Sequence, residues 1–238
     1  MDKLCVIISG GFSLAYQDVL PEFERTTGIG VTTLSGASQG TGTKTIKYQL
    51  DQGADIDVVI LSREGLGELV AKGRIVDGSA AELATVPLGA AVRQGSPHPD
   101  ISNVSALKQT LLNAGLVVMP GSTSGLFVKD EIFPKLGIAG KVSFKIMARG
   151  TESTGLLAAG GADLAIGPLS ELVHQPGIDL VGSLPASVQL VQVFTAAIVN
   201  TSHRAEHARR LIEFLTSDQS EAAITKSGME RADNRRVR

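Results

Sequence analysis

The chain has 238 residues, with 22 lysines and arginines against 24 aspartates and glutamates, so its formal net charge is −2. Hydrophobic residues make up 43% of the sequence and charged residues 19%, which excludes a disordered polyelectrolyte and provides for a substantial core. The near-neutral balance argues against a nucleic-acid-binding protein, whose surface needs a basic excess. The 27 glycines suit an α/β protein with many tight turns between strands and helices.

Short apolar runs alternate with longer stretches of helical periodicity, which is the pattern of parallel β-α-β units. Strands are predicted at 3–9, 30–34, 58–61, 86–93, 115–119, 142–148, 163–167, 178–184 and 190–199. Helices are predicted at 13–27, 41–52, 64–72, 105–113, 125–136, 152–159, 203–216 and 220–226. Within the first helix, Pro21 is expected either to bend the helix or to remove a turn.

The alternation is interrupted by the proline-rich turn at 95–100 and again near Leu184, which predicts two α/β lobes. Lobe I is expected to comprise residues 1–84 and 191–238, and lobe II residues 85–190, with two crossing strands as a hinge. No apolar run approaches the roughly 18 residues of a membrane span. No secretory leader is visible, so we expect a cytoplasmic protein if Met1 is the native start and a periplasmic one if a leader was removed.

One local arrangement recurs four times: a strand ends, a short run of Gly, Ser and Thr follows, and a helix begins. Such a turn offers unpaired backbone N–H groups at the positive end of a helix dipole, and glycine lets a ligand approach the backbone. In an open parallel sheet these turns share the edge at which the strands end. The four turns, two in each lobe, predict an anion held between the lobes by neutral donors. They are Ser9–Ser13, Ser35–Gly40, Pro120–Gly125 and Arg149–Ser153.

The candidate ligand-binding residues are the glycine, the hydroxyl-bearing residues and the arginine of these turns. They are Gly11, Ser13, Ser38, Ser122, Thr123, Ser124, Arg149 and Thr151. The alternative for any single turn is ordinary helix capping, because serine is a common N-cap residue. Neither a P-loop nor a complete dinucleotide fingerprint is present, so we expect a small oxyanion or short carboxylate and no cofactor. Lys44 and Lys47 are further sources of positive charge, although a solvated helix face is the more usual place for such lysines.

Two hydrolytic or metal-dependent alternatives remain open. The segment Gly36–Gly40 matches Gly-x-Ser-x-Gly, in which Ser38 would be a nucleophile at a sharp strand-to-helix turn. Only two strands precede it, and the later histidines occupy polar turns or a charged helix, which argues against a catalytic triad. His203 and His207 are four residues apart and could share a metal ion, but their charged neighbours favour a solvated face, and we predict no metal.

The single cysteine, Cys5, lies in an apolar run, which is typical of a small buried hydrophobe and not of a nucleophile. It leaves no partner for an internal disulfide.

Four segments with consistent spacing resemble the molybdate-binding family of periplasmic substrate-binding proteins, which serve ABC transporters. They are Gly11–Leu14, Phe23–Gly28, Gly36–Gly40 and Gly53–Val59. The resemblance implies the two-lobed type II fold, closure about a hinge, and an oxyanion held by serine hydroxyls and backbone N–H groups. It carries these roles to Ser13, Ser38 and the turns around Ser124 and Thr151. It also implies a membrane permease as a partner. From the charge balance and the lack of a long apolar run we expect no nucleic-acid partner and no direct insertion in the membrane, and we expect a monomer.

The sequence departs from that family in ways that affect the ligand. Pro168 stands where molybdate binders place a tyrosine, and the third turn is unusually rich in hydroxyls, which points to a larger or more highly charged ligand. The stretch Pro176–Pro185 is similar to a divergent branch that includes aconitate-isomerase-like proteins. We therefore expect a protein that binds a small anion, with isomerisation of a small tricarboxylate as the alternative. An isomerase needs a base, for which the candidates are Glu152, Asp55 or a serine-relayed group; Glu152 would otherwise serve as a first-turn helix carboxylate.

Overall fold

The computed structural model describes residues 3–232. The described residues divide into two compact units: unit 1 comprises residues 3–85 and 193–232, and unit 2 comprises residues 86–192. The chain leaves unit 1 within strand β4 (Ala81–Arg93) and returns near the start of β9 (Val191–Ile198). We describe each unit by itself.

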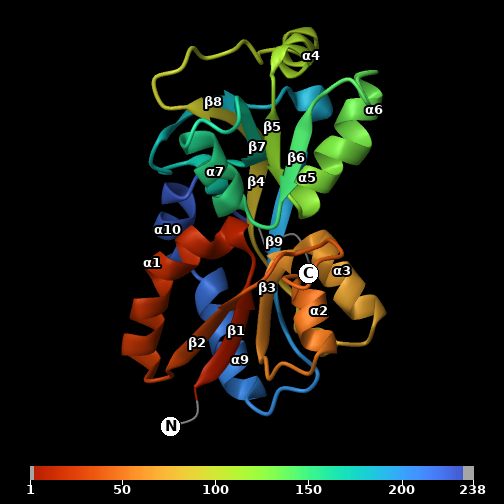
Figure 1. Ribbon diagram of the computed structural model, residues 1–238. Helices are drawn as coiled ribbons and strands as arrows, with labels where there is room; N and C mark the ends of the chain where they lie inside the picture. The colour runs from red at the N-terminus through yellow and green to blue at the C-terminus, as the bar shows by residue number, and fades with distance from the viewer. Residues whose placement is uncertain (1–2, 233–238) are drawn as a thin grey trace. The chain divides into compact units, whose positions relative to one another are not determined.

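Unit 1 is built on a sheet in which β1 lies between two parallel neighbours, β2 and β3, and β9 runs antiparallel to β3. Helices α2 and α3 contribute to a core on one face of this sheet, while α1 packs with α9 and α10 (Figure 1). Phe23 of α1 and Phe214 of α9 meet edge to face at 5.5 Å. Besides its part of β4 and β9, unit 1 contains the following elements, including those just named: β1 (Leu4–Ile8), α1 (Gly10–Thr27), β2 (Val31–Ser35), α2 (Ile46–Asp51), β3 (Val58–Ser62), α3 (Arg63–Ala71), α9 (Ala205–Thr216), the 3₁₀ turn η3 (Asp218–Ser220), α10 (Glu221–Lys226) and β10 (Glu230–Arg231).

Unit 2 is built on a sheet in which β5 lies between β6 and β7 and is parallel to both, and β4 runs antiparallel to β7 and β8. Its largest core contains Leu107, Leu111, Val117 and Phe133 among other buried residues. The remaining elements of unit 2 are α4 (Val104–Asn113), β5 (Val117–Pro120), α5 (Thr123–Phe127), the π-helical turn η1 (Val128–Ile132), α6 (Phe133–Lys135), β6 (Phe144–Met147), α7 (Gly150–Ala158), β7 (Leu164–Pro168), α8 (Leu169–Leu172), β8 (Ile178–Ser183) and the 3₁₀ turn η2 (Ala186–Val188).

The strand and helix pattern explains most of these elements. Every residue of β3 is buried, as an apolar run at the centre of a covered sheet requires. In α1 the buried Ala15, Val19 and Phe23 recur every fourth residue and form one face. The helix continues through Pro21 and ends at Gly28, whose φ of 70° is the left-handed conformation that glycine adopts without strain.

Several elements differ from their sequence-based predictions. Helix α1 begins at Gly10 and not at Ser13, and α2 covers only Ile46–Asp51, because the preceding glycine-rich segment forms a loop. Strand β4 begins five residues earlier than predicted, since Ala84 and Thr85 pair with β10. The short helix α8 was not predicted. Among the described helices, none combines the length and the apolar composition that a membrane crossing requires.

Candidate functional site

The turns that follow β5, β6 and β7 meet at one edge of the sheet of unit 2. Pro120 at the end of β5 is in register with Met147 at the end of β6, and the Gly121 N–H donates to the Met147 carbonyl oxygen at 2.6 Å. A Cβ placed on Gly167 in β7 would lie 3.8 Å from Cδ of Pro120. Two of these turns were expected from the sequence, and the third, between β7 and α8, was not. We call this set of three turns the unit 2 turn cluster.

The first turn of the cluster presents hydroxyls that do not cap their own helix. Ser122 is the residue before α5, yet its side chain makes no capping bond. Ser124 is 3% exposed, and its hydroxyl forms no hydrogen bond among the described residues. Gly125 permits this tight turn, because a Cβ there would overlap the Pro120 carbonyl. Helix capping therefore does not account for Ser122 or Ser124. Thr123 is buried beside them.

The second turn of the cluster carries a cation. Arg149 is the residue before α7; it is exposed, and none of the ion pairs found in the described residues involves it. Thr151 lies in the first turn of α7 and is also exposed. Helix α7 has nine residues, and the Arg149 guanidinium belongs to the residue just before it. The start of such a helix is a favourable place for a carboxylate or oxyanion.

The structure does not place either of the two carboxylates that the sequence suggested as a base, Glu152 and Asp55, as an uncommitted group at the helix-start turns. Oε2 of Glu152 accepts the Ala148 N–H at 3.2 Å, so this side chain caps the start of α7, as the structural alternative predicted. Asp55 belongs to unit 1 and precedes β3, so it lies at the edge of the sheet opposite the helix-start turns. Its carboxylate is exposed and lies 3.7 Å from Nη1 of Arg204.

The third turn of the cluster contains a carboxyl group that sequence reasoning missed. Glu171, in α8, is partly exposed as a residue, but its carboxylate packs against Gly150, where a Cβ would overlap it. Desolvation by burial raises the pKa of this carboxyl to about 7. The hydroxyl of the preceding Ser170 is buried without a hydrogen-bond partner among the described residues. The only sequence signal for either residue was its position directly after the strand that ends at Pro168.

In unit 1 the first turn differs from its prediction. Ser9 precedes α1, is 4% exposed, and its hydroxyl has no hydrogen-bond partner in the described part of the chain. Gly11 lies in the first turn of α1, where any Cβ would overlap the ring of Phe194. Ser13 is not at the helix start as expected but one turn further along, where its hydroxyl accepts from the Gln17 amide at 3.2 Å. Ser9 therefore replaces Ser13 as the hydroxyl at this helix tip.

Ser38 is buried. The sequence predicted that the turn containing Ser38 leads directly into a helix, and in the structure it does not. Its Oγ accepts the backbone N–H of Ser62, the residue that precedes α3, at 2.9 Å, so Ser38 lies at the start of α3. This placement contradicts the nucleophile hypothesis, which requires the serine on a sharp turn between a strand and its own helix. Lys47 is paired with Glu68 at 2.5 Å on a half-exposed surface, which is the solvated position considered above.

The cysteine and the two histidines considered as reactive groups lie in unit 1, and the structure does not favour a catalytic or metal-binding role for them. Burial and the nearby Asp57 raise the pKa of the Cys5 thiol, which disfavours a thiolate nucleophile. Asp57 is fully buried; it accepts the Cys5 N–H at 2.8 Å and pairs with Arg204 at 3.1 Å. His203 precedes α9, so it does not share a helix with His207. Within residues 3–232 no group of three or more His, Cys, Asp or Glu side chains could hold a metal ion.

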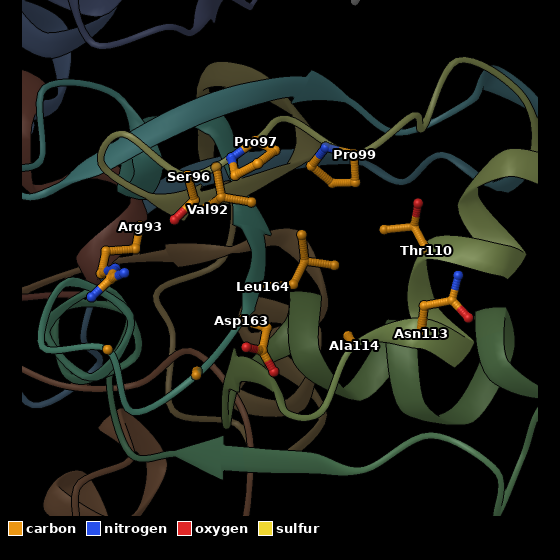
Figure 2. Close-up of a pocket in the computed structure, with 12 residues that line it drawn as sticks. Val92, Arg93, Ser96, Pro97, Pro99, Thr110, Asn113, Ala114, Asp163 and Leu164 are labelled. Atoms are coloured by element: carbon orange, nitrogen blue, oxygen red, sulfur yellow. The ribbon is translucent and has the colours of Figure 1, made fainter.

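A pocket of about 420 Å³ lies elsewhere in unit 2. Figure 2 shows its wall, which includes Arg93, Pro97, Pro99 and Asp163. Asp163 and the neighbouring Leu164 lie at the beginning of β7, so the pocket opens at the edge of the sheet opposite the unit 2 turn cluster. Asp163 already accepts the Leu116 N–H at 2.8 Å. The pocket is therefore distinct from the candidate anion site.

Comparison with known protein families and sequences gives two matches. The model of the family described as "Bacterial extracellular solute-binding protein" matches residues 4–230. An aconitate isomerase of a Pseudomonas species is 35% identical over 227 residues, which cover 95% of this chain and 87% of that protein.

Solved structures give the same fold. The sulfate-binding protein of Mycobacterium tuberculosis H37Rv superposes with a TM-score of 0.78 at 19% identity, over 99% of this chain and 88% of that one. The periplasmic molybdate-binding protein of Azotobacter vinelandii superposes with a TM-score of 0.74 at 19% identity, over 95% and 98% of the two chains. The expected α/β fold of periplasmic binding proteins is confirmed.

Proposed function

Because this chain belongs to the family of bacterial extracellular solute-binding proteins, we propose that it binds a small anion through the helix-start turns described above. The observation that carries the proposal is the unit 2 turn cluster, where the hydroxyls of Ser122, Ser124 and Ser170 are not committed to capping and Arg149 is exposed. Polar groups buried without partners are rare in folded proteins, and a ligand supplies the missing acceptor. Ser9 offers the same kind of hydroxyl in unit 1.

The donor set favours a carboxylate ligand over a compact tetrahedral oxyanion. The two solved structures compared above are named for sulfate and molybdate, whereas the relative of 35% identity is named for aconitate. In this chain Pro168 ends β7 and leads into α8, which brings the Glu171 carboxyl to the cluster. A carboxyl group beside the site repels a compact dianion more than a ligand whose carboxylates are spaced along a carbon chain. We therefore assign the ligand to the di- and tricarboxylates.

Membership of a solute-binding family extends the proposal to a membrane permease of the ABC type as the partner that receives the ligand. Deletion of the gene should then abolish uptake of the carboxylate that the purified protein binds. Unchanged uptake would contradict this extension and leave the ligand assignment intact.

Binding is tested by isothermal titration calorimetry with citrate, trans-aconitate, sulfate and molybdate. We expect saturable one-to-one binding of a tricarboxylate. The variants Ser124→Ala and Ser170→Ala, both in the unit 2 turn cluster, should each weaken it about 10- to 100-fold, the effect of losing one hydrogen bond to a charged group. Ser96→Ala is the matched control, because Ser96 lines the pocket at the opposite edge of the sheet and its loss should leave the affinity unchanged.

The Ser170→Ala variant also separates binding from folding. The hydroxyl of Ser170 has no partner in the described residues, so its removal should not lower the melting temperature of the free protein. Absence of binding by every anion, or equal weakening by all three variants, would contradict the proposal.

Isomerisation of a tricarboxylate is a second candidate function. It is favoured by the 35% sequence identity to the Pseudomonas aconitate isomerase over nearly the whole chain, and by the desolvated carboxyl of Glu171 in the unit 2 turn cluster. Purified protein incubated with trans-aconitate should then produce the cis isomer, which is resolved by chromatography. Tight binding without any product would exclude this candidate and retain the first.

A further inference from the structure

Glu171 occupies the point at which all three turns of unit 2 come together. Its carboxylate packs against Gly150, the first residue of α7, and a Cβ on Gly167 would lie 4.0 Å from its Oε2. The same Gly167 position lies 3.8 Å from Pro120, at the start of the turn that holds Ser124. A ligand bound to the hydroxyls and N–H groups of this cluster is therefore bound next to the Glu171 carboxyl.

The structure leaves this carboxyl uncompensated. Within the described residues no hydrogen bond or ion pair reaches it, in contrast to Glu152, whose carboxylate accepts the Ala148 N–H. The charged groups on the elements that pack against α8 are Arg149 and Glu152 at the start of α7 and Asp179 on β8. Asp179 accepts the Gly95 N–H at 2.8 Å. A buried carboxylate with a structural role has hydrogen-bond partners, whereas the described part of the chain supplies none to Glu171.

We propose that Glu171 is the acid–base group that moves a proton on a tricarboxylate bound at the unit 2 turn cluster. This inference rests on the second candidate function, isomerisation. Because burial raises its pKa to about 7, the carboxyl exists in both protonation states near neutral pH, as a group that must accept and return a proton requires.

The proton transfer balances without a cofactor. The ionised Glu171 carboxylate removes a proton from the methylene carbon of an unsaturated tricarboxylate, and the C–H electron pair forms a new C=C bond to the central carbon. The electrons of the original double bond shift to the far carbon, which takes the proton back from Glu171. One C–H bond is broken and one is formed, the double bond moves by one position, and its geometry is set anew. Charge on the intermediate is spread over the substrate carboxylates, which face N–H and O–H donors.

The test compares Glu171→Gln with Glu131→Gln, the same change at an exposed position of unit 2 outside the unit 2 turn cluster. We expect Glu171→Gln to bind trans-aconitate within about threefold of the wild type by calorimetry, because a neutral amide fits the same space. Its kcat should fall at least about 100-fold, the usual contribution of a general acid–base group. Glu131→Gln should retain kcat within about threefold, and Glu171→Asp should recover part of the activity.

Deuterium exchange distinguishes a catalytic carboxyl from one that only supports the fold. In D₂O the wild-type protein should incorporate deuterium at the methylene and vinyl carbons of the substrate, as detected by proton NMR, and Glu171→Gln should not. The wild-type kcat should depend on an ionisation near pH 7 that is absent from the residual activity of the variant.

The outcomes separate the two proposals. If Glu171→Gln isomerises and exchanges the substrate within tenfold of the wild type, the assignment to Glu171 is wrong and the isomerase function stands. If the wild type binds tricarboxylates but neither isomerises nor exchanges them, the assignment and the isomerase candidate are both wrong and anion binding stands. If the wild type binds no tricarboxylate, the assignment fails together with the proposed function.

Discussion

Replacing Glu171 by glutamine should make the protein more stable at alkaline pH than at acidic pH, relative to the wild type. The pKa of this carboxyl rises from its ordinary 4.5 to about 7 through desolvation in the folded state. An acid whose pKa is raised on folding binds its proton more tightly in the folded state. The unfolded state then binds fewer protons between about pH 4.5 and 7, and the free energy of unfolding falls as the pH rises through that range.

The magnitude follows from the size of the shift. Each pKa unit corresponds to about 1.4 kcal/mol, so ionised Glu171 lowers the free energy of unfolding by about 3 kcal/mol at pH 8 and by less than about 1 kcal/mol at pH 5. Glutamine carries no ionisable group. The stability of Glu171→Gln relative to the wild type should therefore increase by about 2–3 kcal/mol between the two pH values. Any cost of burying the amide is the same at both and cancels.

Urea unfolding followed by circular dichroism at pH 5 and pH 8 measures this double difference. Glu131→Gln, at an exposed position, corrects for the change in net charge. An identical stability difference between Glu171→Gln and the wild type at both pH values would refute the reasoning, because it would mean that the Glu171 carboxyl is not desolvated.

Two further predictions concern the free energy of unfolding and are measured by urea unfolding. Asp57→Ala should lower it by about 3–5 kcal/mol, because Asp57 is fully buried and its partner Arg204 would lose its counter-charge. Asp51→Ala, which removes two partly exposed ion pairs, should lower it by less than about 1 kcal/mol, and equal losses would contradict the burial argument. Gly11→Ala should cost about 1–3 kcal/mol, because the new methyl group overlaps the Phe194 ring. Gly67→Ala, on an open face of α3, should be neutral or stabilising by up to about 1 kcal/mol, and a loss of stability there as large as at Gly11 would show that the overlap is not the cause.

The sequence was informative about strands and helix faces because apolar runs and four-residue spacing are local patterns. The spacing of Ala15, Val19 and Phe23 identified the buried face of α1 before any contact was known. The start of β4 was missed because Ala81–Thr85 has no strand pattern of its own, and its pairing with β10 joins residues about 145 positions apart in the chain. Local propensity carries no information about such partners.

The candidate site was only partly predictable for the same reason. The hydroxyl-rich turns could be located from Gly, Ser and Thr at strand ends, but their individual roles depended on where each helix begins. The sequence pointed to Ser13 as the hydroxyl at the first helix start, but α1 begins at Gly10, so Ser9 is the residue that precedes the helix. Glu171 was missed because its desolvation arises from packing against Gly150, a tertiary contact that no motif encodes.

A crystal structure of the protein grown with trans-aconitate tests the central claim most directly. We expect a ligand carboxylate within hydrogen-bond distance of Ser124 and the backbone N–H groups at the start of α7, with a substrate carbon next to the Glu171 carboxyl. Electron density for the ligand only in the pocket lined by Arg93 and Asp163, or none at all at saturating concentration, would contradict it.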